Sequence, residues 1–123
     1  MQWITEQRIA NADRYDKAFA GVSSIQIPTR RSIVKHVYHL YIIRVERRDE
    51  LLAYLLENGI EAKIHYPIPV HLQKAAKHLG YKKGDFPNCE KDCKRIISLP
   101  AHQHLSDEEV AYTIKMVRKF YGG

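Results

Sequence analysis

The segment HVYHLYIIRV, residues 36–45, constrains the fold of this chain more than any other stretch. It is rich in β-branched and aromatic residues, which predicts a strand. Successive side chains of a strand point to opposite faces, so Tyr41 and Ile43 share one face while Leu40 and Ile42 share the other. Both faces are apolar. The pattern therefore predicts a central strand that is covered on both sides.

Most of the remaining chain has the apolar spacing of helices. A capping box, in which Ser106 is followed three residues later by Glu109, marks the start of the last helix. The expected helices are Trp3–Phe19, Arg48–Asn58, Val70–Leu79, Asn88–Arg95 with Asn88 as its cap, and a final helix that ends near Tyr121.

Two short segments complete the predicted sheet. Ile60–His65 and Ile96–Leu99 read as strands, whereas residues 22–35 and 81–87 read as loops. The sum is an α+β fold, a small antiparallel sheet of about three strands with helices packed on it, preceded by a long N-terminal helix.

Length and composition fit one folded domain, since the chain has 123 residues and 45% of them are hydrophobic. No apolar run approaches the roughly 20 residues that a membrane span needs. The N-terminus lacks the apolar region of a signal peptide. Two cysteines without a secretion signal favour a reducing, cytoplasmic setting, and no membrane partner is expected.

The formal net charge of +6 suits an anionic partner, such as a phosphorylated ligand or an acidic protein. The basic residues are scattered, however, and RVERRDE and EKDCKR alternate in sign as solvated surfaces do. No nucleic-acid-binding motif is present. We therefore expect no nucleic-acid partner.

Two sets of residues could serve as metal ligands or nucleophiles. Cys89 and Cys93 share one helical face, and His102 and His104 follow them. Zinc cysteines usually lie closer together on a turn, so small buried residues that face the sheet are the favoured interpretation and no metal site is predicted. Cys93 precedes two basic residues that would lower a thiol pKa, but no orienting group is evident.

A proline-rich turn is the strongest candidate for a site. His65, Tyr66 and His71 lie in and around a turn that Pro67 and Pro69 stiffen. Imidazoles and a phenol on a rigid turn suit recognition of phosphate or hydroxyl groups. The residues alone support such a binding role and strand-end packing equally.

The order of segments resembles the C-terminal domain of the DegT/StrS family of sugar aminotransferases. WITEQRIANADRYDKAF is similar to the long connecting helix of that family, which here would be residues 1–21, and residues 22–123 would be the small domain. The YHLY strand, the RDEL helix start, the NGI turn and the HYP–P–H loop resemble its C-terminal stretch. The GDFP block that leads to SLP and the closing helix LSDEEVAYTIKMVRKFY follow in the same order.

The resemblance implies transfer of an amino group, usually from glutamate, to a keto group on a nucleotide-linked sugar. Pyridoxal phosphate is the carrier in such enzymes. The lysine that forms the imine, and most of the residues that hold the cofactor, belong to a large N-terminal domain of the family. Lys63 and Lys74 do not lie in the lysine motif of the family, so we expect neither catalytic nor cofactor-binding residues in this chain.

The resemblance also places substrate-binding residues. The HYP loop helps to surround the sugar nucleotide in this family, which here implies contacts from His65, Tyr66, Pro67 and His71. His39 of the YHLY strand is a further candidate. These histidines would be substrate contacts rather than metal ligands or acid–base catalysts.

Two functions follow as hypotheses. In the first, the chain is the C-terminal piece of a nucleotide-sugar aminotransferase, is inactive alone, and works with the large N-terminal domain. In the second, it is a freestanding module that kept the fold and binds an anionic ligand or a protein. Whether the chain itself is an enzyme stays open. We expect a homo-oligomer, because a domain without its partner exposes apolar surface.

Overall fold

The computed structural model describes residues 1–123. Its elements are helix α1 (Gln2–Phe19), strand β1 (Ile25–Gln26), strand β2 (Tyr41–Val45), helix α2 (Arg48–Glu57), the 3₁₀ helices η1 (Val70–Leu72) and η2 (Lys74–Leu79), helix α3 (Pro87–Arg95), strand β3 (Ile96–Leu99) and helix α4 (Asp107–Phe120). The strands form one antiparallel sheet in the order β1-β2-β3. The predicted fold class is confirmed.

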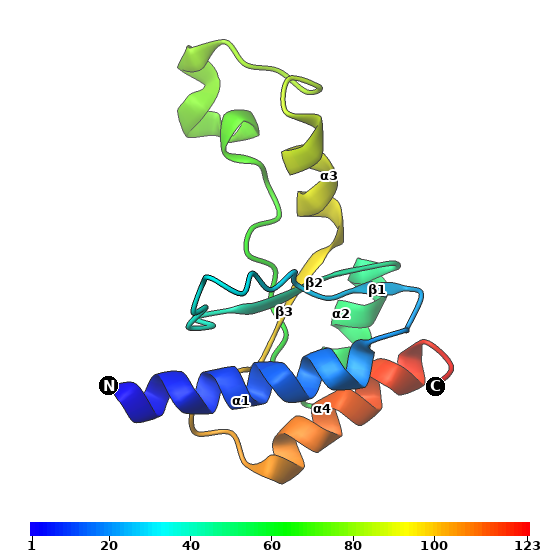
Figure 1. The fold of residues 1–123 in the computed structure, drawn as a ribbon. Coiled ribbons are helices and arrows are strands. Elements are labelled where there is room, and N and C mark those ends of the chain that lie inside the picture. Colours follow the sequence, from blue (N-terminus) through cyan, green and yellow to red (C-terminus); the bar gives the residue numbers. More distant parts are fainter.

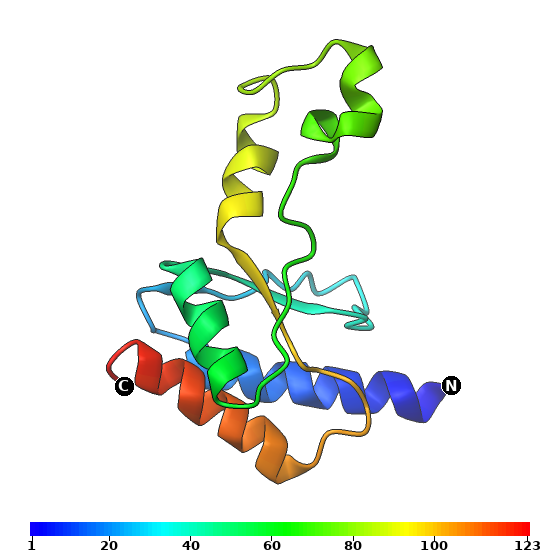
Figure 2. The ribbon, with the colours of Figure 1, turned by 180° about the vertical axis from the view of Figure 1, so that it is seen from behind.

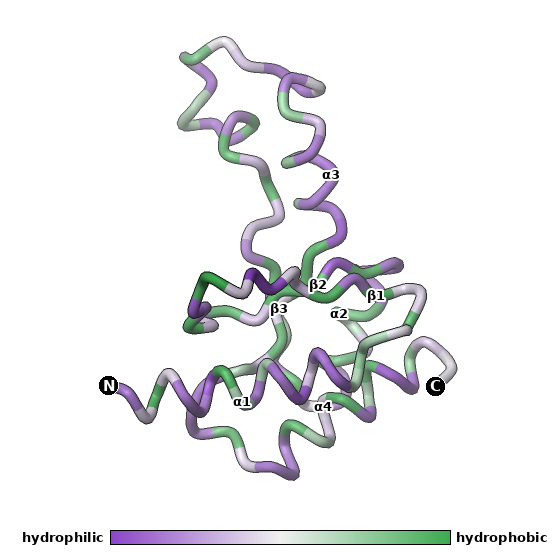
Figure 3. Tube along the Cα trace, in the orientation of Figure 1, coloured by the Kyte–Doolittle hydropathy of each residue, from purple (hydrophilic) through white to green (hydrophobic).

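Helices α1 and α4 lie side by side along one face of the sheet, and α2 packs beside α4 (Figures 1 and 2). The β2 residues Tyr41, Ile43 and Val45 face these helices and are buried. Ile42 and Arg44 on the other face are only half-buried, so the cover predicted for both sides is complete on one side alone. The rings of Tyr15 and Tyr41 lie 5.0 Å apart between α1 and the sheet. The core therefore occupies the layer between the sheet and the helices, where hydrophobic residues gather in Figure 3.

Residues 66–95 leave this body as an arm, which comprises η1, η2 and α3 and stands clear of the sheet (Figure 1). Its descending helix α3 is largely hydrophilic (Figure 3). The other face of the sheet meets the arm through the guanidinium of Arg44, which donates to both carboxylate oxygens of Asp92 at 2.9 and 2.7 Å. The body and the arm are therefore joined by a polar contact as well as by the chain.

The strand predicted for residues 36–45 begins only at Tyr41. Tyr38 has a φ of 47°, in the left-handed region, which interrupts an extended backbone. The Arg8 guanidinium donates hydrogen bonds to the carbonyls of Tyr38 and His39 at 3.1 and 2.9 Å, which holds this turn in place. A tertiary contact thus shortens a segment whose composition favours a strand.

The strand predicted at Ile60–His65 is wrong, because only Lys63 pairs with a neighbour, Ser98 of β3. The amide of Ile60 donates to the Leu55 carbonyl at the end of α2, so the chain is still leaving that helix. The third strand is instead Ile25–Gln26, within a segment expected to be a loop. Two residues are too short for a periodic signal.

The last helix and the first agree with prediction, and the middle ones differ in detail. Ser106 and Glu109 form the capping box of α4, in which the Ser106 amide donates to the Glu109 carboxylate at 2.7 Å. The helix predicted over residues 70–79 is two 3₁₀ turns, which lack an apolar face long enough to pack. Phe86, not Asn88, precedes α3 as its N-cap.

No helix in the structure combines the length and apolar character needed to cross a membrane.

Candidate functional site

A pocket of about 530 Å³ lies where α1, the turn before β2, the segment after α2, strand β3 and helix α4 converge. Its wall combines apolar residues with many hydrogen-bond donors. The basic, imidazole and hydroxyl side chains that line it are Arg8, His39, Lys63, His65, Ser98, His102, Tyr112 and Thr113. The carboxylates of Glu61 and Glu109 line the pocket as well, but donors predominate, which suits a ligand rich in hydroxyl or phosphate oxygens.

His65 is fixed in the wall of this pocket by strand β3. Its Nδ1 lies 2.9 Å from the Ser98 hydroxyl, and Ser98 is buried. The short pairing of Lys63 with Ser98 brings the two side chains together, since their backbones exchange hydrogen bonds of 3.1 and 2.8 Å. This arrangement leaves Nε2 of His65 without a protein partner, so that it can bind a ligand.

His39 lines the same pocket from the turn before β2. The Arg8 guanidinium holds that turn through the carbonyls of Tyr38 and His39, and it also donates to Gln103 at 3.2 Å. Arg8 is therefore engaged in positioning backbone rather than free to bind an anion. The structure brings His39 and His65 into one pocket.

Lys63 and His102 were missed by sequence reasoning. The ammonium group of Lys63 lies 2.7 Å from the Glu61 carboxylate, which holds the pKa of Glu61 below its usual value. His102 follows β3 and lines the pocket. A signal for Lys63 was available, because it lies two residues before His65 and hence on the same face of an extended segment.

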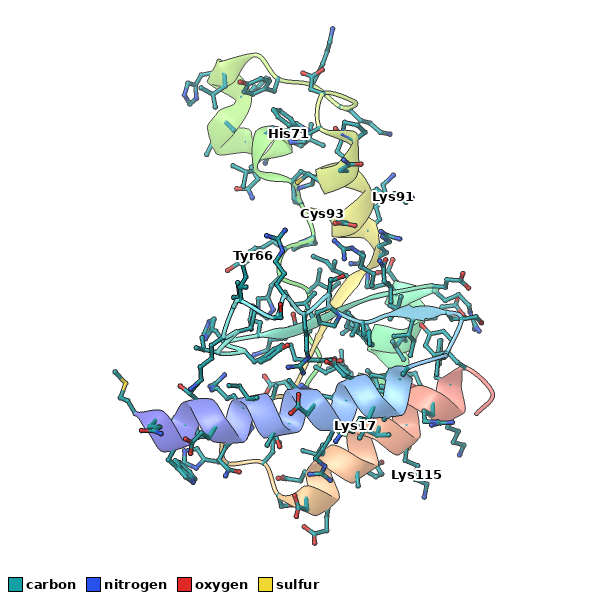
Figure 4. All side chains as sticks on the ribbon, in the orientation of Figure 1. Lys17, Tyr66, His71, Lys91, Cys93 and Lys115 are labelled. Carbon is teal, nitrogen blue, oxygen red and sulfur yellow. The ribbon has the colours of Figure 1, made fainter.

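Tyr66 and Pro67 lie outside the pocket, at the root of the arm. Tyr66, which is labelled in Figure 4, is 69% exposed. Its ring meets the His65 ring edge-on, with the centroids 5.5 Å apart. Both residues face solvent beside the pocket. They can contact only a ligand or domain that extends beyond it.

His71 lies in the arm, away from the pocket, and points into the space between the two limbs of the arm (Figure 4). Its side chain is 8% exposed, and Nε2 lies 3.0 Å from the Glu90 carboxylate. The Phe86 ring packs on it with centroids 4.8 Å apart. His65 and His71 are therefore not brought together, although they flank one turn in sequence.

The cysteines share one helix but not one environment. Cys93 is buried, and burial raises the pKa of its thiol, whereas Cys89 is exposed. The interpretation that both are buried is thus wrong for Cys89. No group of three or more His, Cys, Asp or Glu side chains converges as a metal site would require.

The residues of this chain do not fit an imine with pyridoxal phosphate. Every lysine is exposed to solvent. Lys63, which alone among them lines the pocket, is paired with Glu61. A lysine poised for imine formation is usually desolvated or placed beside another cation, whereas Lys63 is exposed and paired with a carboxylate.

Comparison with known proteins gives a consistent result over nearly the whole chain. The model of the DegT/DnrJ/EryC1/StrS aminotransferase family matches residues 1–118. A pleiotropic regulatory protein of Geobacillus stearothermophilus is 38% identical over 95% of this chain and 32% of its own. The dTDP-3-amino-3,4,6-trideoxy-alpha-D-glucose transaminase of Streptomyces venezuelae is 35% identical over 93% of this chain and 30% of its own.

The structural comparison agrees. DesV of S. venezuelae, solved in complex with a ketimine intermediate, matches with a TM-score of 0.93 and 33% identity. The match covers 98% of this chain and 32% of that one. A DegT DnrJ EryC1 StrS aminotransferase from Brucella abortus gives a TM-score of 0.87 at 34% identity, over 98% and 32% of the two chains. The chain spans about a third of the length of these relatives, and it belongs to the DegT/DnrJ/EryC1/StrS aminotransferase family.

Proposed function

We propose that this chain is the C-terminal domain of a pyridoxal-phosphate-dependent aminotransferase that acts on nucleotide-linked keto-sugars, with glutamate as the amino donor. Similarity to a dTDP-sugar transaminase across 30% of the length of that enzyme supports this assignment. The chain alone is inactive, because the imine-forming lysine and the cofactor contacts come from a large N-terminal domain. Two free thiols fit a cytoplasmic setting.

The observation that carries the proposal is the set of donors in the pocket. His39, His65 and His102 with Lys63 surround a space that can accept phosphate or sugar hydroxyl oxygens. Nε2 of His65 is the foremost of these donors, because Ser98 fixes the ring while leaving that nitrogen free. Tyr66 and Pro67 border the pocket from the root of the arm and extend the same wall.

The exposed apolar residues of this chain form the contact surface for the large N-terminal domain. Ile33, in the loop before β2, is 91% exposed, and Val70 of the arm is 74% exposed. Val34 and Val37 of the same loop, and Ile68 and Leu72 of the arm, are exposed as well. Contiguous apolar surface on a monomer usually marks an interface. About two thirds of the length of the relatives lies outside the matched region, and we assign this surface to a domain equivalent to that part. The assembled enzyme is a homo-oligomer.

The first test is whether the chain alone binds the cofactor. The purified chain is mixed with pyridoxal phosphate, reduced with borohydride and mapped by peptide mass spectrometry. We expect only sparse labelling spread over exposed lysines, because none is poised for an imine. One stoichiometric adduct at a single lysine would overturn the division of labour between the two domains.

The second test uses a full-length hybrid, in which this chain replaces the matching third of the S. venezuelae transaminase. His65→Asn keeps a polar atom near Ser98 but removes the second ring nitrogen. We expect the KM for the nucleotide sugar to rise about tenfold, the loss of roughly one hydrogen bond to a charged group. His78→Asn, at an exposed position outside the pocket, is the matched control. A KM that His65→Asn leaves unchanged would refute the site.

A further inference from the structure

The arm has almost no apolar core of its own. Of residues 66–95, only Pro69, His71, Ala76 and Cys93 are buried. Hydrophobic burial is the main stabilising contribution in most domains, and this segment has little of it. Its defined shape must therefore depend on specific polar contacts.

One carboxylate supplies three of these contacts. A single oxygen of Glu90, in the first turn of α3, accepts hydrogen bonds from the backbone amides of Gly84 and Phe86 at 2.7 and 3.4 Å. The same oxygen lies 3.0 Å from Nε2 of His71. The Glu90 side chain is 12% exposed, so the contact is largely shielded from water. Glu90 thus joins three separate parts of the arm at one point.

The joined parts close the arm across its two limbs. His71 lies in η1 on the rising limb, Phe86 precedes α3 on the descending limb, and Gly84 lies in the loop between them. The rings continue the connection, since Phe86 packs on His71 and meets Tyr81 edge-on at 5.2 Å. Figure 4 shows His71 directed from one limb toward the other.

This contact has a consequence for the proline-rich turn. The lower end of the turn is fixed to the body where His65 bonds to Ser98. The upper end continues through buried Pro69, the N-cap of η1, to His71. We propose that Glu90 is a positioning residue, which holds the turn between His65 and His71 in the orientation that presents Tyr66 and Pro67 to the substrate.

The proposal rests on the proposed function for its substrate, but the geometry of the turn is independent of it. Without the Glu90 carboxylate, Nε2 of His71 has no hydrogen-bond partner in a site that is shielded from water. Shielded polar groups without a partner are costly, so the limbs separate. The backbone amides of Gly84 and Phe86 lie in exposed residues and can bond to water instead. The loosening is therefore confined to the arm.

The test compares Glu90→Ala and Glu90→Gln in the 123-residue chain by amide hydrogen exchange. We expect exchange in residues 66–86 to accelerate about ten- to a hundredfold in Glu90→Ala, while strands β2 and β3 stay protected. Glu90→Gln keeps an acceptor oxygen and gives a smaller change. Glu57→Ala, at the exposed end of α2, is the control. Unchanged exchange in the arm of Glu90→Ala would overturn the proposal.

A second variant covers the case in which Glu90→Ala does not fold. His71→Phe keeps a ring against Phe86 but removes the contact to the carboxylate, and it must loosen the same residues. If exchange there is unchanged, the proposal fails.

The hybrid enzyme separates this inference from the proposed function. If the turn contacts substrate, Glu90→Ala raises the KM for the nucleotide sugar and Glu90→Gln restores most of it, with kcat changed little in both. A loosened arm with an unchanged KM would refute the substrate contacts of Tyr66 and Pro67, while the positioning role of Glu90 in the arm would stand.

Discussion

One buried hydroxyl in this chain is matched to a single backbone acceptor. Tyr15 is fully buried in α1, and its hydroxyl donates to the Pro100 carbonyl at 2.7 Å. Burial raises the pKa of Tyr15 to about 12, so the hydroxyl stays protonated and donating well above neutral pH. This one bond ties the first helix to the turn that follows β3.

Tyr15→Phe should therefore lower the free energy of unfolding by about 1–2 kcal/mol, because the half-buried Pro100 carbonyl loses the donor that the buried Tyr15 hydroxyl supplies. Tyr112→Phe is the matched control, since the exposed Tyr112 hydroxyl also donates to a backbone carbonyl, that of Asn58 at 3.2 Å. It should change stability little. Urea unfolding followed by circular dichroism measures both, and equal losses would contradict the role given to burial.

At the scale of elements, helix α3 is attached to the sheet by charge. Asp92 receives two hydrogen bonds from Arg44 and a third from Arg95 at 3.2 Å. The bonds from Arg44 lower the pKa of Asp92 below its ordinary value of 3.8. Because the folded state favours the carboxylate, this stabilisation is present above pH 3.8 and is lost as the pH falls through the lowered pKa.

Asp92→Asn should accordingly lower the melting temperature at pH 7, because it weakens the attachment of α3 to the sheet. The difference in melting temperature from the parent chain should shrink as the pH falls toward 3. Thermal unfolding of both proteins at several pH values tests the sign of the effect. Asp85→Asn, on an exposed loop of the arm, is the control. If the difference in melting temperature between Asp92→Asn and the parent grows as the pH falls, the stabilising role of the ionised Asp92 is contradicted.

The elements also show how far sequence reasoning reaches. Helix α4 was predicted with its cap because Ser106 and Glu109 are local signals, and a capping box acts within one turn. The early part of the strand at residues 36–45 was mispredicted because the Arg8 guanidinium, some 30 residues away, engages its carbonyls. No local pattern encodes such a contact.

The candidate site follows the same division. His65 could be singled out from the sequence because it lies beside the turn that Pro67 and Pro69 stiffen. Its partner Ser98 could not, because the isolated pairing of Lys63 with Ser98 replaces the full strand expected there. His71 was assigned to the ligand from its neighbourhood in sequence, whereas Glu90, 19 residues later, determines where it lies.

Across the whole molecule, exposed apolar side chains occur on several separate segments. Large side chains are exposed on the arm, on the loop before β2 and at Trp3 of the first helix. We expect the isolated chain to self-associate through these residues in the absence of a large domain.

The expected result is a light-scattering mass that rises with concentration. A joint Ile33→Ser and Val70→Ser variant should shift the protein toward monomer. Leu56→Ser, which removes an exposed leucine from α2, is the matched control and should not. A monomer over a wide concentration range in the parent chain would contradict the expectation.

The arm leaves and rejoins the body at adjacent points, because Lys63 and Ser98 exchange backbone hydrogen bonds of 3.1 and 2.8 Å. A segment whose two ends lie together is an insertion site, and its length adds only slowly to the entropy of closing the loop. Grafting the arm of one relative onto the body of another should therefore leave the core of the recipient intact. The arm can therefore differ between relatives without a change in how the body folds, and ligand recognition can change with it.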